Sequence, residues 1–360
     1  MRGDSSINAN TRIKWIDVCK GILILLMVWG HIPNISERHG IEVKYMNEFL
    51  AMSPYYVCWF MQAFFIMTGF TTNFEVGGGV FVKKQIKTII IPWLSFSIIS
   101  RVFYVLYLGE GLYYNYDGLN YFFLIEDYWF LSALFFSKIT LFVLKKTIQS
   151  EMIICFILIC MMVVGFLSIV IFNNTPNPYH YYNYLHFKDF LCMAFFIWVG
   201  TILKRYYVYH SFIFKISVAF FVMMFVFRSY LNSLLCFIGI EYSVLNPVVI
   251  SHYANIHSIY QLPIYVFYVL TGSFSMFYFV QKIKPLFIFS YFGRNSLVIY
   301  CAHFVFLCVY IDLVYELITP DNLLSSLLFL LSVMTLSLLS LFIIIRLLEY
   351  RPFKYLLGKF

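Results

Sequence analysis

The chain has 360 residues, of which 62% are hydrophobic and only 12% are charged, and its mean hydropathy is +0.83. Soluble domains contain about 25% charged residues, so this composition excludes a water-soluble globular protein and predicts an integral membrane protein. The net charge is +8, but the basic residues follow a membrane topology pattern, described below, which argues against nucleic-acid binding.

Apolar runs of about 20 residues recur along the whole chain, and no polar block is long enough for a separate soluble domain. We predict an all-α bundle with a cytoplasmic arm at 1–14, one transmembrane domain at 15–350 and a cytoplasmic tail at 351–360. The ten predicted spans are 16–33, 55–74, 87–108, 122–143, 152–172, 188–203, 211–229, 260–280, 288–310 and 324–348.

The basic residues between these spans are distributed asymmetrically. One set of loops, together with both termini, contains Arg2, Arg12, Lys14, Lys83, Lys84, Lys87, Lys145, Lys146, Lys204, Arg205, Lys282, Lys284, Arg294, Arg351, Lys354 and Lys359. The opposite loops contain only Arg38, Lys44 and Lys188, with Arg228 nearby. Because Lys and Arg are enriched in cytoplasmic loops, the pattern predicts that both termini are cytoplasmic. The expected location is the cell (inner) membrane.

The first span contains three ionisable residues, Asp17, Lys20 and His31. The eleven steps from Lys20 to His31 make about three helical turns, so the two side chains share one face, roughly 16 Å apart along the axis. Asp17 falls on the same side. Ionisable groups in hydrocarbon are costly and need water or a partner, so this face is predicted to line a cavity. A polar seam needed only for folding would give the same pattern.

Span two and the segment after it are rich in glycine. Gly69 favours close packing of helices over contact with a ligand. The segment from Val76 to Trp93 is predicted to be a loop in which glycines permit a tight reversal, placing Lys83, Lys84 and Lys87 at the cytoplasmic mouth. These lysines are either a topology signal alone or a site for the phosphates of a cytosolic cofactor.

Spans three and four contain further charged residues. Arg101 lies within span three, where it cannot face lipid unless it snorkels to the interface. Asp127 and Trp129 open span four at the outer interface, where an aromatic belt would also explain the Trp. Lys138 lies well inside the span, which favours a functional role.

Two later segments are candidates for contact with a substrate. The outer loop 173–187 is rich in Tyr, Asn and His and can bind a sugar, although an interfacial belt predicts the same residues. His303 is buried in span nine, either as a packing residue or facing the same cavity as His31. The eight cysteines lie mostly inside apolar runs without a C-x-x-C pair, so no metal site or disulfide framework is predicted.

Several motifs together resemble the membrane acyltransferase family 3. D-V-C-K-G-I-L-I-L-L-M-V-W-G-H resembles the family's first span, where a basic residue, here Lys20, precedes a His, here His31, by eleven positions in a D-x-x-[RK]-G context. The variant with Lys is similar to the branch named for fucose 4-O-acetylase. Further matches are F-F-I-M-T-G-F at 64–70, Lys87 with Pro92, W-F-L at 129–131 and F-G-R-N-S-L-V-I-Y-C-A-H at 292–303.

The resemblance implies transfer of an acyl group, usually acetyl, from cytosolic acyl-CoA to a sugar hydroxyl of a surface polysaccharide or glycolipid. In that case His31 is the general base, or forms an acyl-His intermediate, and Asp17 and Lys20 pair at the inner end of the cavity. The residues expected to bind acyl-CoA are Lys20, Lys83, Lys84, Lys87 and Arg101. The residues expected to bind the acceptor are Trp129, Asp127, Lys138 and His303.

The expected partners are acyl-CoA, a sugar or lipid-linked glycan, and membrane lipid, with no nucleic acid and no metal. Two alternatives remain open at this point. A transporter or flippase for a lipid-linked glycan would use the same polar cavity without acyl chemistry, and a membrane scaffold would tolerate substitution of the polar residues in span one. Binding of acyl-CoA distinguishes the first alternative from an acyltransferase.

Overall fold

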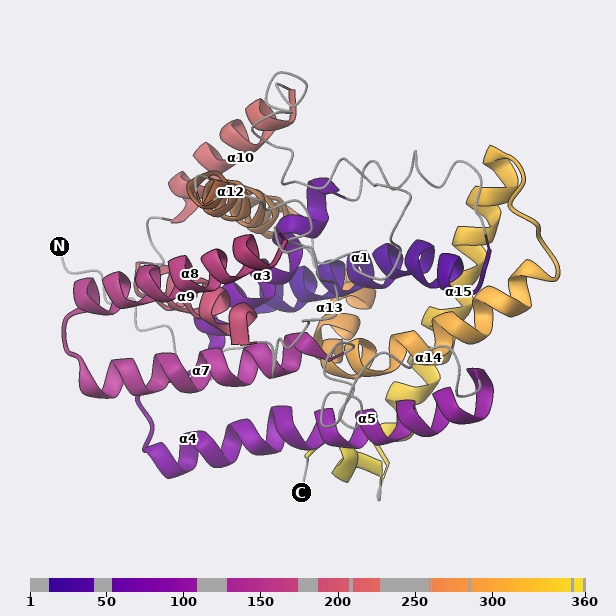
Figure 1. Cartoon of the computed structure of the whole chain (residues 1–360), viewed down its shortest axis with the longest axis horizontal. Coiled ribbons are helices and arrows are strands. Elements are labelled where there is room, and N and C mark those ends of the chain that lie inside the picture. The colour runs from indigo at the N-terminus through magenta and orange to yellow at the C-terminus, as the bar shows by residue number, and fades with distance from the viewer. Residues whose placement is uncertain are drawn as a thin grey trace.

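The computed structural model describes residues 13–41, 54–108, 128–173, 187–206, 210–226, 259, 261–283, 286–350 and 353–358, and these residues contain helices and no β-strand. Figure 1 shows the arrangement. The α-helices are α1 (Lys14–Arg38), α3 (Pro54–Thr71), α4 (Gly78–Gln85), α5 (Ile91–Phe103), α7 (Trp129–Thr147), α8 (Glu151–Asn173), α9 (Phe187–Arg205), α10 (His210–Val226), α12 (Gln261–Lys282), α13 (Phe287–Arg294), α14 (Ser296–Tyr315) and α15 (Leu323–Leu348). Two π-helical segments, η1 (Ile86–Ile90) and η2 (Tyr104–Leu108), and a 3₁₀-helix, η8 (Phe353–Leu357), complete the set.

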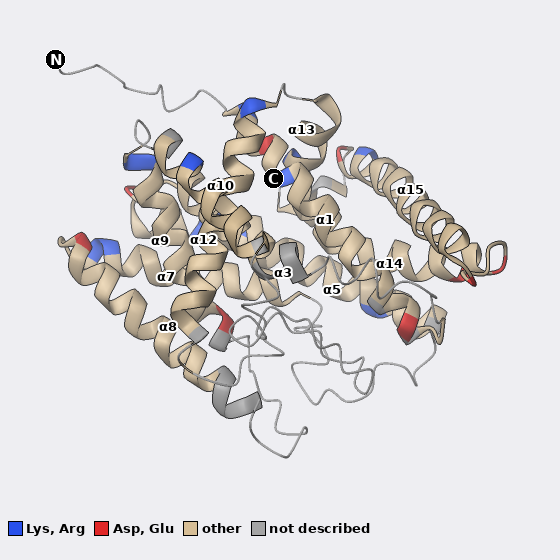
Figure 2. Ribbon diagram, turned by 90° about the horizontal axis from the view of Figure 1, so that it is seen from above, with Lys and Arg blue, Asp and Glu red and all other residues tan. Residues whose placement is uncertain are grey.

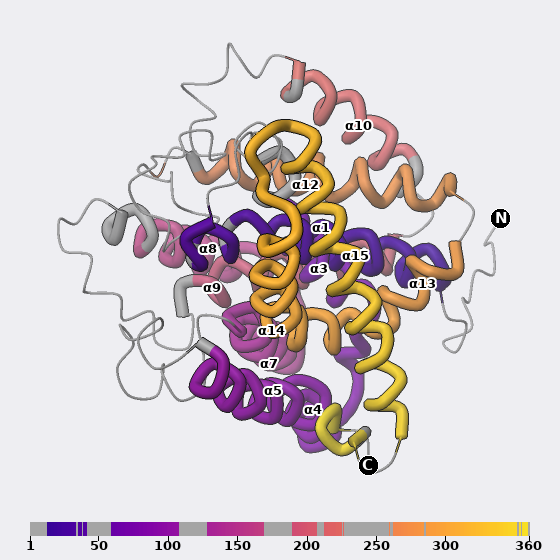
Figure 3. The backbone as a smooth tube through the Cα atoms, turned by 90° about the vertical axis from the view of Figure 1, so that its right-hand side faces the viewer, coloured from indigo at the N-terminus to yellow at the C-terminus, as the bar shows by residue number. Residues whose placement is uncertain are grey.

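Helices α1 and α3 run through the middle of the bundle. Helices α10 and α12 lie along one edge, and α4 and α5 lie along the opposite edge (Figures 1 and 3). This central position explains the burial of α1, in which Cys19, Leu23 and Val28 are fully enclosed. A spanning helix that is surrounded by other helices can carry ionisable side chains without exposing them to lipid.

Within the described residues, six helical segments are long and apolar enough to cross a membrane. They are Lys14–Glu37, Gly78–Tyr107, Glu151–Ser168, Leu262–Lys282, Ser296–Tyr315 and Leu323–Leu348. Helices α3, α7, α9 and α10 coincide with the other four predicted spans. The described residues are all-helical, as predicted, and include six candidate membrane spans, whereas the count of ten spans stays a prediction.

The third spanning helix begins earlier than predicted. Segments α4, η1, α5 and η2 form one helical run that starts at Gly78, so the predicted loop from Val76 to Trp93 is wrong. Glycines weaken a helix least at its first turn, and the residues after Gly79 are all compatible with a helix. As a result, Lys83, Lys84 and Lys87 lie on helical turns and not in a reversal.

The predicted span 288–310 is two helices in the structure. Helix α13 ends and α14 begins around Asn295, whose side-chain amide donates a hydrogen bond to the Tyr291 carbonyl (3.0 Å). This break lets the short α13 pack along α1 while α14 takes a different course. The position of this break is important because the first turn of α14 lines the cavity described below.

Glycines bring two pairs of helices into backbone contact. A Cβ atom at Gly69 would lie 1.8 Å from the Ile197 carbonyl oxygen, and one at Gly200 would lie 1.9 Å from the Ile66 oxygen, so α3 and α9 cross through these glycines. A Cβ at Gly293 of α13 would lie 1.7 Å from the Asp17 oxygen of α1. The predicted packing role of Gly69 is confirmed.

The two ends of the bundle differ in charge. Figure 2 shows most of the Lys and Arg residues in the half that also contains α13 and the C-terminal segment. There Glu151 binds both Lys145 (3.5 Å) and Arg205 (2.9 Å). At the other end of α1, His39 contacts the Asp312 carboxylate through Nδ1 (2.7 Å). This polarity agrees with the predicted sorting of basic residues; which end faces the cytoplasm stays a prediction.

Candidate functional site

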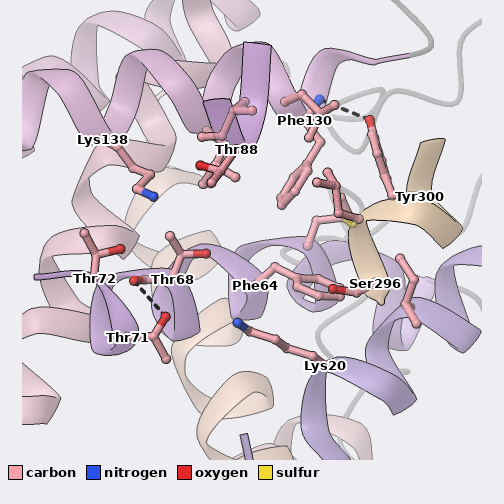
Figure 4. Close-up of a pocket in the computed structure, with 16 residues that line it drawn as sticks. Lys20, Phe64, Thr68, Thr71, Thr72, Thr88, Phe130, Lys138, Ser296 and Tyr300 are labelled. Atoms are coloured by element: carbon pink, nitrogen blue, oxygen red, sulfur yellow. Dashed lines mark hydrogen bonds between the residues drawn. The ribbon is translucent and has the colours of Figure 1, made fainter. Parts of the chain in front are cut away.

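A cavity of about 230 Å³ lies between α1, α3, η1, α7 and the start of α14 (Figure 4). Its lining combines apolar side chains with two lysines and several hydroxyl groups, and it contains no Asp or Glu. The lining residues are Lys20, Ile24, Met61, Phe64, Thr68, Thr71, Thr72, Thr88, Ile89, Phe130, Leu131, Leu134, Lys138, Ser296, Leu297 and Tyr300. A space with cations and hydroxyls but no carboxylate favours an anionic ligand.

The two lysines enter the cavity from different helices. Lys20 comes from α1 and Lys138 from α7, and Figure 4 shows the two amino groups on opposite sides of the threonines, with Lys138 near Thr68 and Thr88 and with Lys20 near Phe64. The charged neighbours of Lys138 are Lys84 and Lys20, and both are cations. Cations gathered in one place repel one another, so an anion bound between them would be stabilised.

The threonine hydroxyl groups come from the end of α3, the residue after it and the π-helical segment η1. Thr68 and Thr71 are one turn apart on α3, and Thr72 directly follows this helix. The Thr88 hydroxyl, in η1, donates to the Lys84 carbonyl (2.8 Å). Single π-helical turns inside longer helices occur frequently at functional sites, and here such a turn supplies Thr88 and Ile89 to the cavity wall.

The first turn of α14 also reaches the cavity. Ser296 and Leu297 line it, and the N-cap residue Asn295 makes no capping hydrogen bond with its side chain. The preceding helix α13 ends at Arg294, and the Asn295 N–H donates to the Tyr291 and Phe292 carbonyls of that helix. Through Ser296 and Leu297, the start of α14 forms one wall of the cavity.

A pair of imidazoles lies further along α1. The ring centroids of His31 and His303 are 5.1 Å apart, and the Phe304 ring contacts both, at 4.9 Å from His31 and 4.5 Å from His303. His303 is only 1% exposed, whereas His31 is partly exposed. Two histidines that are 272 residues apart in the sequence are thus neighbours in the structure.

An aromatic pair separates the cavity from the imidazoles. Phe130 and Tyr300 line the cavity, their rings are 5.3 Å apart, and the Phe130 amide donates to the Tyr300 hydroxyl (3.3 Å). On the far side the Tyr300 ring lies 6.1 Å from the His303 ring. His31 does not line the cavity, so of the predicted polar face of α1 only the Lys20 part reaches it, and Tyr300 lies between the cavity and His303.

The remaining predicted site residues are dispersed. Lys83 and Lys84 are exposed on α4, and Lys87 is partly exposed in η1. Arg101 lies fourteen residues beyond Lys87 on the same helical run, about 21 Å along its axis, and does not line the cavity. Asp17 is partly exposed and precedes Lys20 by three residues, so the two residues are about one helical turn apart on α1.

Of the residues predicted on the outer side, the structure describes Trp129 but not Asp127. Trp129 begins α7 and packs edge-on against the Phe130 ring (6.1 Å). Asp127 and most of the predicted sugar-binding loop 173–187 lie outside the described residues. Within the described part of the chain, no group of three or more His, Cys, Asp or Glu side chains is arranged to hold a metal ion.

Sequence reasoning missed the hydroxyl lining and the aromatic pair. Thr68, Thr71 and Thr72 have a signal that could have been used, because polar residues three and four apart in an apolar span mark one face. Tyr300 has no such signal, since tyrosines occur throughout this chain, which contains 30 of them.

Comparison with known proteins gives one match. A family model described as an acyltransferase domain, of the acyltransferase 3 type, matches residues 13–346. This range covers nearly the whole chain and includes the cavity and both imidazoles. No curated protein and no solved structure is significantly similar to the chain.

Proposed function

Because the chain belongs to this acyltransferase family, we propose that it is an integral membrane O-acyltransferase that moves an acyl group, acetyl in the first instance, from acyl-CoA to a sugar hydroxyl. The acceptor in this proposal is a cell-surface polysaccharide or glycolipid. The main observation in favour of an anionic donor is that lysines, and no Asp or Glu, line the cavity. A transporter without acyl chemistry is not favoured by membership of an acyltransferase family.

The charge and size of the cavity support a specific way of holding the donor. Ligand pockets typically measure about 300 to 1,000 Å³, so a cavity of about 230 Å³ would take only part of acyl-CoA. In the proposal, Lys20 and Lys138 attract the phosphates, and the exposed Lys83 and Lys84 attract the part that stays outside. Lys138 is thereby assigned to the donor and not to the acceptor, because it shares the cavity with Lys20.

The orientation of the bundle is part of the same proposal. Acyl-CoA is cytosolic, and the end of the bundle that is rich in Lys and Arg would face it under the positive-inside rule. The imidazole pair lies beyond the cavity along α1 and would meet an acceptor that is presented from the other side. One passage interrupted by Phe130 and Tyr300 would thus serve two substrates.

The reaction follows from these positions. His31 accepts the proton of the acceptor hydroxyl as that oxygen attacks the thioester carbonyl carbon. A C–O bond forms, the C–S bond breaks, and the CoA thiolate leaves and regains a proton from the imidazolium. Because Phe130 and Tyr300 lie between the cavity and His31, one of these side chains has to move to let the thioester pass.

The proposed function is tested by binding and by product analysis. Purified protein in lipid nanodiscs should bind acetyl-CoA in isothermal titration calorimetry, and the mass of the surface glycan should fall by whole acyl groups in cells that lack the protein. The size of the mass difference identifies the acyl group. Absence of acetyl-CoA binding together with an unchanged glycan mass would exclude an acyltransferase.

Neutralising the cavity lysines is expected to weaken donor binding. Hydrogen bonds to charged groups are worth about 1.5–3 kcal/mol each, so Lys20→Met and Lys138→Met should each raise the Kd for acetyl-CoA by roughly 10- to 100-fold. Lys204→Met is the matched control, because Lys204 is exposed on α9 outside the cavity, and its Kd should stay within a few-fold of wild type. If all three substitutions raise the Kd equally, the affinity for acetyl-CoA depends on the overall charge of the protein and not on the lysines of the cavity.

A further inference from the structure

The second imidazole of the pair has a defined hydrogen-bonding state. Nδ1 of His303 lies 2.7 Å from the Tyr300 carbonyl oxygen, one turn earlier on α14. A carbonyl oxygen can only accept, so Nδ1 carries the hydrogen and donates it. In the neutral ring the other nitrogen, Nε2, is then an acceptor only.

That acceptor atom is unsatisfied in the structure. Nε2 of His303 is buried and has no hydrogen-bond partner among the described residues. Buried polar atoms without a partner are rare in native proteins because each one costs free energy, so an unsatisfied atom next to a candidate active site points to a ligand. The partner has to be an O–H or N–H donor.

The position of Nε2 connects it with the proposed reaction. The His303 ring faces the His31 ring at 5.1 Å, and Phe304 packs against both rings. His31 is partly exposed, so a substrate can reach it. A substrate group in contact with the His31 ring would be a neighbour of the His303 ring. A hydroxyl group that binds to His31 would therefore lie beside the His303 ring.

We propose that Nε2 of His303 binds the acceptor substrate by accepting a hydrogen bond from a hydroxyl group next to the one that His31 deprotonates. The inference deepens the proposed function and rests on it. A hydroxyl has one hydrogen and cannot donate to both rings at once, so two imidazoles side by side fit an acceptor with two neighbouring hydroxyls, as a sugar has. His303 thus selects which hydroxyl faces His31 and does not itself take up the proton.

Two substitutions separate this role from a purely structural one. His303→Asn retains a side-chain N–H near the Nδ1 position for the Tyr300 carbonyl but has nothing at the Nε2 position. His303→Gln reaches the Nε2 position with an amide whose oxygen can accept. If Nε2 binds the acceptor, transfer of labelled acetyl from acetyl-CoA should fall about 100-fold in the Asn variant and about tenfold or less in the Gln variant. If only the bond to Tyr300 matters, the order is reversed.

The acceptor used is the surface glycan extracted from cells that lack this protein, and the enzyme is the full chain in nanodiscs. The Kd for acetyl-CoA should stay within a few-fold of wild type in both variants. Wild type that binds no acetyl-CoA and transfers no acetyl would contradict the proposed function itself. Wild type that transfers acetyl, combined with a His303→Asn variant at least as active as His303→Gln, would overturn the inference alone.

A measurement on the unsubstituted protein covers the case in which the variants do not fold. In ¹⁵N-histidine spectra, the Nε2 resonance of His303 should be that of an unprotonated nitrogen and should shift when the extracted glycan is added. The resonance can be assigned because it is missing from the spectrum of His303→Phe. It can also be assigned in unsubstituted protein that is joined by split-intein ligation, so that only the segment with α14 is labelled. A protonated Nε2, or a resonance that does not move with the glycan, would overturn the inference.

Discussion

Replacing His31 with Ala is expected to lower kcat/KM for acyl transfer by about 10²- to 10⁴-fold, because that is the usual contribution of a positioned general base. His31 lies on α1 with its ring against His303 and Phe304, on the far side of the aromatic pair from the lysine cavity. Since the residue does not line the donor cavity, the affinity for acetyl-CoA should change by only a few-fold. The loss should therefore appear in kcat and not in donor binding.

His39→Ala is the matched control for this experiment. His39 follows α1, two turns after His31, and contacts Asp312 through Nδ1 (2.7 Å), so it belongs to a polar contact at the end of the bundle. The Tyr107 hydroxyl donates to the other oxygen of the same carboxylate (3.0 Å). Transfer by His39→Ala should stay within a few-fold of wild type. Transfer by His31→Ala within a few-fold of wild type would remove His31 from the reaction.

Replacing Gly293 with Ala is expected to destabilise the protein by about 3 kcal/mol or more, the upper part of the range for overpacked sites. The added Cβ would lie 1.7 Å from the carbonyl oxygen of Asp17 and 2.9 Å from the amide nitrogen of Gly21. Both are backbone atoms and cannot rotate away, so α13 and α1 would have to separate. The measurement is the apparent Tm in detergent, with acetyl-CoA binding as a second readout, since the displaced segment of α1 carries Lys20.

Gly79→Ala provides the control for the change from Gly to Ala in a helix. No atom lies within 4 Å of the position that a Cβ would take at Gly79 in α4. Ala is favoured over Gly in a helix by up to about 1 kcal/mol, so the apparent Tm should stay the same or rise slightly. A Gly293→Ala protein that is as stable as Gly79→Ala would mean that α1 and α13 are not in backbone contact.

The crossing of α1 and α13 also explains why a break at Asn295 is important for the site. Helix α13 follows α1 closely through Gly21 and Gly293, and the turn at Asn295 then redirects the chain so that Ser296 and Leu297 reach the cavity. A continuous helix over 288–310 could not follow α1 and also change direction at the cavity. The break into two helices at Asn295 therefore brings His303 next to His31.

Composition and helical periodicity are local properties, so the sequence alone predicted the class of protein, the approximate positions of most apolar helices and the eleven-residue spacing of Lys20 and His31 on α1. It also predicted the acyltransferase family, with which the family match agrees. The tertiary structure was needed to show that Lys138 shares a cavity with Lys20, that Tyr300 lies between this cavity and His303, and that His303 faces His31. The physical reason is that these contacts join helices far apart in the chain, and the angles at which helices cross depend on close packing at glycines and on a break such as Asn295, which no periodic pattern specifies.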